Sequence, residues 1–311
     1  MPDEENEAPV SDPADPSTRL EQAQNGRAPD PEPHGEAPTT LFDRDTAVEL
    51  LRESDATNRV YRARIDPSWW ILRGPNGGYL AAIILRACLR AVDDDTRTPR
   101  SLTIHYASAP VAGLAEIETR VERRGRSLTT VSARLTQAGK LIAIALTAAS
   151  SPRNDGFELD HARMPEHVLP EELGADAPPR TEFGRHFDMR FLPDSAPRIG
   201  SERAEIAAWI RLREPHALDY PRLATYTDAF PPACFALETE SSRLGGFPTV
   251  DLNIHFHTAL PLPMASRDDF SFGVFRTQIG HQGFVAEDGE IWSRDGVLLA
   301  QSRQLAVVMG G

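Results

Sequence analysis

The sequence predicts an α+β fold made of two copies of one unit, each a long apolar helix packed against an antiparallel sheet. Each half contains one apolar stretch of helical length and several short stretches that alternate as strands do. Similar segments also recur at a nearly constant distance. His105 in TIHY and His255 in NIHF are 150 positions apart, and the turn residues Gly139 and Gly296 are 157 apart. Such spacing indicates a duplication whose offset grows only through loops.

The first 38 residues differ in composition from the rest of the chain. They contain ten acidic residues against two basic ones, are rich in proline and hold almost no large apolar residue. A segment of this kind cannot bury enough apolar surface to offset the entropy of ordering. We therefore expect residues 1–38 to form a disordered tail. The tail carries −8 of the formal net charge of −13, so the rest is only mildly acidic.

The first predicted module covers residues 39–150. It begins with a short helix capped by Thr40 or Asp43, whose apolar positions extend to Leu51. A strand, NRVYRARI, comes next, and GPNGG then interrupts the chain before a long apolar helix that starts near Tyr79. We expect antiparallel strands in the four segments that follow, which are SLTIHYASAP, LAEIETRVER, SLTTVSARLTQ and KLIAIALTAAS. Ala138-Gly139 is expected to form a tight hairpin turn.

Residues 151–184 are Pro-rich, acidic and without period, which predicts a linker. The second module, 185–311, repeats the first. We expect strands in HFDMRFL and AEIAAWIRL, then the helix TDAFPPACFALE, and then further strands in TVDLNIHFH, DFSFGVFRT, GFVAEDGEIWSRD and VLLAQSRQLAVV. A sheet that curls around one long helix is the hotdog architecture. The sequence therefore predicts a double hotdog.

Five motifs, taken in order, resemble the acyl-CoA thioesterase II (TesB-like) family of double-hotdog thioesterases. They are GPNGGYLAAIILRA, RRGRSLTTVSARLTQAGKLIA, YTDAF, PTVDLNIHFH and DGVLLAQSRQ, within about Leu41 to Val308. The resemblance implies a catalytic trio of Asp, Thr and Gln around one water molecule. Matched by position, these residues are Asp228, Thr249 and Gln304. The resemblance also implies a cleft between the modules that holds the thioester.

Each member of this trio has a purely structural alternative. Asp228, expected at the start of the second helix, could serve only as its N-cap. Thr249 could simply begin a strand, where alternation groups it with Asp251 on the face opposite Leu252. Gln304 could belong to a structural hydrogen-bond network. As a base, Asp228 would need partial burial to raise its pKa, whereas a helix N-terminus would lower it.

Gly77 and Gly78 are candidate oxyanion contacts. Glycines at a helix start admit close approach to free backbone N–H groups. The resemblance to single-domain hotdog thioesterases extends to this Gly-Gly entry, although Asn76 stands where many of them carry His. The first half has no carboxylate here and has Thr147 at the position of Gln304. We therefore predict one site per chain, with the base from the second half and oxyanion contacts from the first.

Several partner classes are not expected. No apolar run approaches the roughly 18 residues of a membrane helix, and the first residues, MPDEENEAPV, have neither the basic nor the apolar region of a secretory signal, so none is expected. With two cysteines, too few for a disulfide framework, these features favour a cytoplasmic protein. The globular part shows no basic stripe, so nucleic-acid binding is not expected. His255 and His257 lack a third ligand, so no metal is expected, and no cofactor is required. Arg123, Arg124 and Arg126 form either a solvated turn or a contact for CoA phosphates.

The predicted function is hydrolysis of acyl-CoA to a free carboxylic acid and CoA. Two alternatives stay open from the sequence. A hotdog enoyl-CoA hydratase would need an Asp/His pair, and no His lies near Asp228 in the sequence. A non-catalytic acyl-CoA-binding protein would bind the same ligand without turnover. Hotdog modules often associate through their sheets, so a homo-oligomer is compatible with the sequence.

Overall fold

The computed structural model describes residues 40–72, 74–153, 157, 159–174, 181–237 and 244–310. The chain divides into two units, Met1–Thr39 and Thr40–Gly311. The tail predicted for residues 1–38 lies outside the described residues. The second unit contains all the elements discussed below.

The described residues form one antiparallel sheet of 12 strands. Its first half consists of β1 (Val48–Glu53), β2 (Asn58–Ile65), β3 (Thr98–Tyr106), β4 (Gly113–Arg124), β5 (Leu128–Gln137) and β6 (Lys140–Ser150). Its second half consists of β7 (Phe187–Phe191), β8 (Glu205–Leu212), β10 (Thr249–Phe256), β11 (Ser271–His281), β12 (Phe284–Trp292) and β13 (Leu298–Val307). A separate short pair is β9 (Leu244–Gly246) with β14 (Met309–Gly310).

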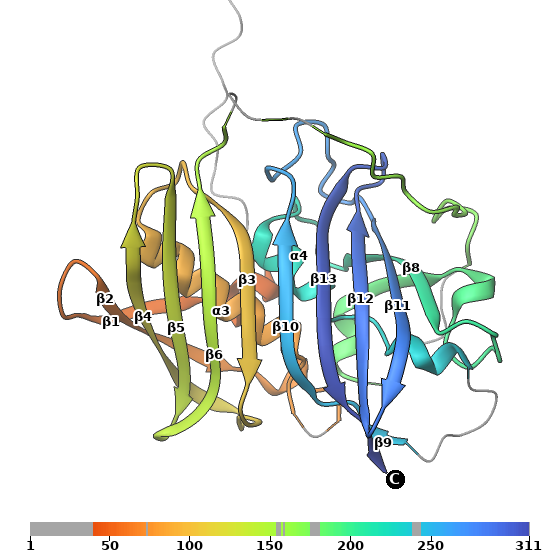
Figure 1. The fold of residues 1–311 in the computed structure, drawn as a ribbon, viewed down its shortest axis with the longest axis horizontal. Coiled ribbons are helices and arrows are strands. Elements are labelled where there is room, and N and C mark those ends of the chain that lie inside the picture. The colour runs from red at the N-terminus through yellow and green to blue at the C-terminus, as the bar shows by residue number, and fades with distance from the viewer. Residues whose placement is uncertain are drawn as a thin grey trace, which may run out of the picture. The chain divides into compact units, whose positions relative to one another are not determined.

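The strand order is the same from either edge of the sheet. It runs β1-β2-β4-β5-β6-β3 in the first half and continues β10-β13-β12-β11-β8-β7 (Figure 1). The halves meet where β3 pairs with β10, and Thr103 there lies opposite Asn253, its counterpart at the offset of 150. A local two-fold relation therefore runs through this pair, which confirms the predicted duplication. The module limits, 39–150 and 185–311, and the linker between them stay predictions.

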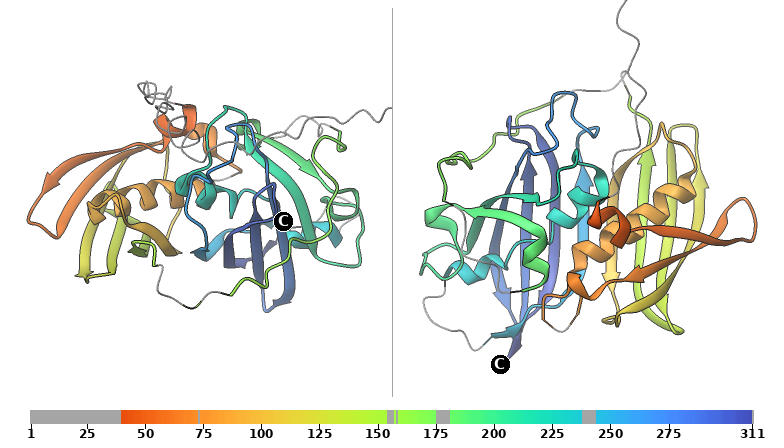
Figure 2. Two further views of the ribbon diagram at one scale, coloured as in Figure 1. Left: turned by 90° about the horizontal axis from the view of Figure 1, so that it is seen from above. Right: turned by 180° about the vertical axis from the view of Figure 1, so that it is seen from behind.

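The long helix α3 (Gly77–Val92) lies inside the curled sheet of the first half. It contacts all six strands of that half. In Figure 2, the β1–β2 hairpin lies on the side of the helix that faces away from β4, β5 and β6. The Asn76 side chain caps the helix by accepting a hydrogen bond from the Tyr79 N–H. The helix is apolar nearly all round because it is enclosed nearly all round.

The predicted helix at the start of the first module is too long. The helix α2 (Leu41–Asp45) has the expected cap, since Thr40 and Asp43 form a capping box. It ends at Asp45, however, and Val48 already pairs with β2 as part of β1. Strand pairing therefore outweighs the helical spacing of the apolar residues in this segment.

The predicted helix TDAFPPACFALE is wrong. The helix in this region, α4 (Tyr220–Tyr226), ends before Asp228, and a 3-10 helix, η4 (Ala233–Leu237), follows. Pro231 and Pro232 explain the break, because proline lacks an N–H and disfavours helical geometry in the residue before it. The other 3-10 helices are η1 (Pro67–Trp69), η2 (Phe183–His186) and η3 (Pro193–Ser195).

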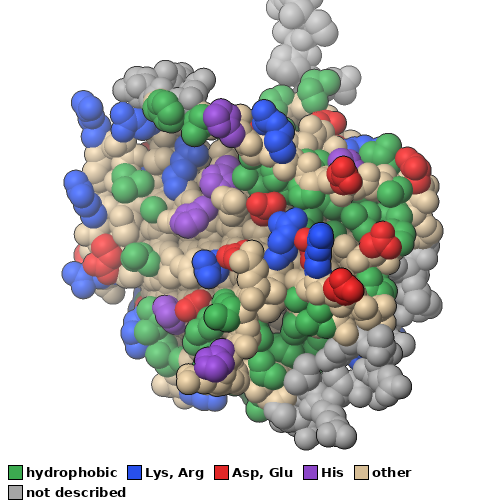
Figure 3. All heavy atoms as spheres, turned by 45° about the vertical axis from the view of Figure 1, so that its right-hand side comes forward, with side chains coloured by type: hydrophobic (Ala, Val, Ile, Leu, Met, Phe, Trp, Pro, Cys, Tyr) green, Lys and Arg blue, Asp and Glu red, His purple; other side chains and the backbone are tan. Residues whose placement is uncertain are grey.

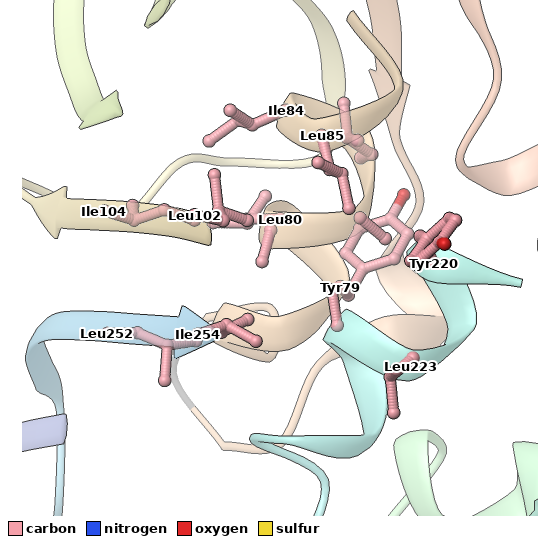
Figure 4. Close-up of a cluster of buried hydrophobic side chains, with 14 of the residues drawn as sticks. Tyr79, Leu80, Ile84, Leu85, Leu102, Ile104, Tyr220, Leu223, Leu252 and Ile254 are labelled. Atoms are coloured by element: carbon pink, nitrogen blue, oxygen red, sulfur yellow. The ribbon is translucent and has the colours of Figure 1, made fainter. Parts of the chain in front are cut away.

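One hydrophobic core extends across both halves. Figure 4 shows side chains from α3, α4, β3 and β10 packed together at the junction, among them Leu80, Ile84, Leu102, Ile104, Leu223, Leu252 and Ile254. A buried cation adds a second link, since Arg222 of α4 donates to Asp43 at 2.8 Å and to Thr40 at 2.9 Å. Apolar contacts and hydrogen bonds therefore both join the two halves.

Candidate active site

Asp228 lies at the start of a helix, but not of its own. It follows the C-terminal end of α4, and its Oδ2 accepts hydrogen bonds from the Gly78 N–H and from Asn76 Nδ2, both at 2.9 Å. Asn76 Nδ2 also donates to the Asp228 carbonyl oxygen at 2.6 Å. The carboxylate from the second half thus sits at the N-terminus of α3 in the first half. The expected cap on a second helix is wrong because that helix is broken.

Gly78 allows the two halves to approach this closely. A Cβ atom there would lie 2.7 Å from the Thr225 carbonyl oxygen and 3.1 Å from the Asp228 Cβ. Thr225 Oγ1 also donates to the Gly78 carbonyl at 3.2 Å. The backbone that approaches this glycine is therefore that of α4. The N–H group of Gly78, which the sequence predicts to be free for an oxyanion, donates to the Asp228 carboxylate in this structure.

The environment of Asp228 favours its neutral form. Burial raises the pKa of this carboxyl to about 7, against the stabilising Gly78 N–H, and the charge of Glu287 adds to the increase. Tyr106 is the other titratable neighbour, and its hydroxyl donates to the Gly77 carbonyl at 2.8 Å. Burial raises the pKa of Tyr106 well above its ordinary value, so it stays neutral. A carboxylate with a pKa near neutrality has the strength required of a general base.

Thr249 and Gln304 form a second group with a residue that the sequence analysis missed, Glu287. Thr249 Oγ1 donates to Gln304 Oε1 at 3.0 Å, and Gln304 Nε2 donates to Glu287 Oε1 at 2.9 Å. The three side chains come from the neighbouring strands β10, β13 and β12. Their order across the sheet follows the pairing of Gln304 with Leu252 on one side and with Glu287 on the other.

A β-bulge brings Thr249 to this group. Thr249 lies opposite Ala306, whereas Asp251 lies opposite Leu305, so Val250 is the extra residue. The bulge reverses the alternation before Asp251 and places Thr249 on the same face as Ala306 and Gln304. The predicted grouping of Thr249 with Asp251 is wrong for this reason.

Glu287 is buried, with 5% of its surface exposed. Its Oε2 accepts from the Ala233 N–H at 2.6 Å, and burial raises the pKa of its carboxyl. A signal was present in the sequence. Alternation along AEDGEIW puts Glu287 on the same face as Gly289 and Ile291, which is the apolar side. A carboxylate at an inward strand position requires hydrogen-bond partners and so suggests a role.

The predicted site residues thus fall into two groups. Asp228, Gly77 and Gly78 lie together at the start of α3, and Thr249 joins Gln304. The segment after α4 touches both groups, because it carries Asp228 and also the Ala233 N–H that binds Glu287.

Other sequence features lie outside these groups. Arg124 donates to the Val92 carbonyl at 2.7 Å, which satisfies the C-terminal end of α3. His257 faces Gln301 on the exposed side of the sheet. In the described ranges, no three His, Cys, Asp or Glu side chains are grouped to hold a metal. In Figure 3 basic side chains gather toward the left edge and acidic ones toward the right, so that face has no single sign of charge.

The predicted cleft between the modules stays a prediction. One surface pocket is lined by Arg211, Tyr226 and Leu260, and another by Phe42 and Trp69, among other residues. Asp228, Thr249 and Gln304 line neither pocket.

No helix in the described ranges combines the length and apolar character needed to cross a bilayer.

Two family models match the chain along most of its described part. The acyl-CoA thioesterase N-terminal domain matches residues 66–150, and the acyl-CoA thioesterase C-terminal domain matches residues 163–308. The chain belongs to the acyl-CoA thioesterase family. This membership confirms the predicted family and identifies the protein as a thioester hydrolase. It therefore favours the hydrolase over the two alternatives, a hydratase and a non-catalytic binding protein.

Known relatives and solved structures are similar to this chain along most of its length. An uncharacterized protein of Mycobacterium tuberculosis is 27% identical over 301 residues, which cover 86% of this chain and 98% of the relative. The crystal structure of a putative thioesterase II from Thermobifida fusca YX is similar with a TM-score of 0.75 and 29% identity, covering 88% and 99% of the two chains. A hot dog fold protein from Alicyclobacillus acidocaldarius has a TM-score of 0.73 at 24% identity over 88% and 99%, which supports the double-hotdog fold.

Proposed function

We propose that the protein hydrolyses acyl-CoA to a free carboxylic acid and CoA, with Asp228 as the general base. The observation that carries this proposal is the position of Asp228. Its carboxyl, with a pKa of about 7, bridges the two modules at the start of α3. A base of this strength can take a proton from water and return it near neutral pH.

Thr249 and Gln304 would hold the attacking water. The Thr249 hydroxyl proton points to Gln304 Oε1, so the lone pairs of Oγ1 remain to accept a hydrogen bond from water. The second proton on Gln304 Nε2 is available to a further acceptor, since the first goes to Glu287. Asp228 would accept the other proton of the water as its oxygen attacks the thioester carbonyl carbon.

The backbone of Gly77 and Gly78 would then stabilise the oxyanion. The Gly78 N–H donates to Asp228 Oδ2 in the resting site. When Asp228 takes the proton, its carboxyl becomes a weaker acceptor, and the N–H is released as negative charge develops on the thioester oxygen. Collapse of the tetrahedral intermediate breaks the C–S bond, and the proton on Asp228 passes to the departing thiolate. Acyl-CoA and water thus give the acid and CoA.

A thiol-release assay over a panel of acyl-CoA chain lengths tests this function. We expect turnover that depends on Asp228, together with formation of the free acid in equal amount. Binding without thiol release for every acyl-CoA in the panel would contradict it. An enoyl-CoA substrate that loses its enoyl absorbance while no thiol appears would instead indicate a hydratase. The cytoplasmic location and the homo-oligomer stay predictions from the sequence.

A further inference from the structure

We propose that Glu287 is a positioning residue of this site, whose carboxylate fixes the amide of Gln304 and thereby directs the hydroxyl of Thr249. The inference rests on the proposed function and adds a residue to the trio. Its basis is the row of hydrogen bonds that runs from Glu287 through Gln304 to Thr249 across three neighbouring strands.

The Glu287 carboxylate accepts hydrogen bonds from three donors among the described residues. Gln304 Nε2 donates to Oε1 at 2.9 Å, and Oε2 accepts from the Ala233 N–H at 2.6 Å and from Thr277 Oγ1 at 3.4 Å. These donors come from β13, η4 and β11, which surround the carboxylate. An ionised carboxylate, which only accepts, is the species that satisfies them all.

The ionised carboxylate leaves only one orientation for the Gln304 amide. A reversed amide would place Oε1 against Glu287, and two acceptors cannot share a hydrogen bond. With Nε2 fixed toward Glu287, Oε1 faces Thr249 and must receive its hydroxyl proton. Thr249 then presents lone pairs to the site and can only accept from water. The charge on Glu287 therefore sets the direction of each hydrogen bond along this row.

The same charge acts on Asp228. The groups of the first half that face Asp228 are Asn76 and the backbone of Gly77 and Gly78, and Tyr106 donates its hydroxyl proton to the Gly77 carbonyl. Besides these neutral groups, Glu287 supplies a negative charge, and a like charge favours the protonated form of a carboxyl. Asp288, the neighbour of Glu287, faces the other side of the sheet, where it pairs with Arg303.

The fold itself does not require an acid at this position. Glu287 pairs with Gln304 in the second half as Val131 pairs with Thr147 in the first. Val131 is fully buried there, and β5 packs on α3 without any carboxylate. Since burial of a charged group costs free energy, a carboxylate retained only where the site residues lie indicates a role in that site.

The variant Glu287→Gln tests the proposal, with Asp288→Asn as the matched loss of one charge on the same strand. A glutamine can donate as well as accept, so it no longer determines the amide orientation of Gln304. We expect Glu287→Gln to lower kcat by about 10- to 100-fold with little change in KM. The acidic limb of the kcat/KM profile should move to lower pH, because Asp228 loses a like charge. Asp288→Asn should leave both the rate and the limb nearly unchanged.

A structural role alone would lower the melting temperature of Glu287→Gln while leaving kcat and the acidic limb in place, and this result would overturn the proposal. Carbon-13 NMR titration of the carboxyl groups provides a readout independent of turnover. The pKa of Asp228 should fall in Glu287→Gln and hold in Asp288→Asn. An unchanged pKa of Asp228 would also count against the proposal.

Wild-type protein gives a further measurement if the variant does not fold. The Gln304 side-chain N–H resonance should shift as the Glu287 carboxyl titrates, and a resonance that does not respond would contradict the assignment. Should wild-type protein release no thiol from any acyl-CoA, the proposed function fails on its own. The NMR titrations would still decide whether Glu287 orients Gln304 and acts on Asp228.

Discussion

The two halves of the sheet have the same strand order but opposite character at equivalent positions. In the first half, the pair across β5 and β6 is Val131 and Thr147, whereas in the second half the pair across β12 and β13 is Glu287 and Gln304. One half thus carries a valine and a threonine, and the other a glutamate and a glutamine, on the same framework. The duplication preserves the sheet, while the side chains at this position differ between the halves.

The helices differ in the same sense. The first half has α3, a helix of 16 residues enclosed by its sheet, and the second has only α4, of seven residues, before the Pro231-Pro232 break. Because α4 ends early, the chain is free to carry Asp228 across to the start of α3. The absence of a long helix after Tyr226 therefore lets Asp228 of the second half contact the start of α3 in the first half.

The largest expected effect comes from Asp228→Asn. Asparagine retains an oxygen that can accept from Gly78, but it cannot take a proton from water. We expect kcat to fall at least about 100-fold, a typical loss for a general base. Thiol release measures the rate, and thermal unfolding checks that the junction of α3 and α4 is intact. A variant with the full wild-type rate would leave Asp228 only a structural role.

The comparison of the halves predicts a second contrast, between Gln304→Ala and Thr147→Val. Both residues occupy the same place in their own half, and both variants remove a polar group. Loss of Gln304 should misplace the water and lower kcat by about 10- to 100-fold, whereas Thr147→Val should stay close to the wild-type rate. The two rates are compared with saturating acyl-CoA. Equal losses would mean that each half holds a working site.

Gly78→Ala tests the junction itself. The added Cβ would lie 2.7 Å from the Thr225 carbonyl oxygen, so α3 and α4 would have to separate. We expect a loss of about 1–3 kcal/mol in the free energy of unfolding, as for other overpacked sites. Gly174→Ala is the control, because among the described residues, its chain neighbours aside, no atom lies within 4 Å of a Cβ there. If denaturant unfolding finds the two variants equally stable, the close contact at Gly78 does not determine the stability of the junction between α3 and α4.

The sequence predicts those parts of the fold that depend on local pattern. Alternation and turn residues locate the strands, and Ala138-Gly139 forms the expected turn, with positive φ at both residues. The duplication is visible in the spacing of motifs. Pairing of β3 with β10 has no such local signal, because either strand could have remained an edge.

The site is less accessible to this kind of reasoning. Resemblance to a family supplies Asp228, Thr249 and Gln304, but each is placed wrongly or incompletely by local rules. The bulge at Val250 depends on register with β13, and the position of Asp228 depends on a contact with the other half. Both are tertiary features. Glu287 was within reach, because an acid on the apolar face of a strand is a visible exception.

The last expected effect is on the pH dependence of stability, and it separates Asp228 from an ordinary surface acid. The pKa of Asp228 is raised from 3.8 to about 7 in the folded protein, so the folded state binds more protons than the unfolded state between these values. The free energy of unfolding contributed by this group should therefore decrease as pH rises from about 4 to about 7. Asp228→Asn removes this contribution, and its stability should decline less over that range than that of the wild-type protein. Asp288→Asn, which removes an exposed acid on β12, should retain the wild-type slope. Urea unfolding at several pH values measures the three slopes. If all three coincide, the carboxyl is not held in its neutral form, and the junction at α3 does not tune Asp228 as a base.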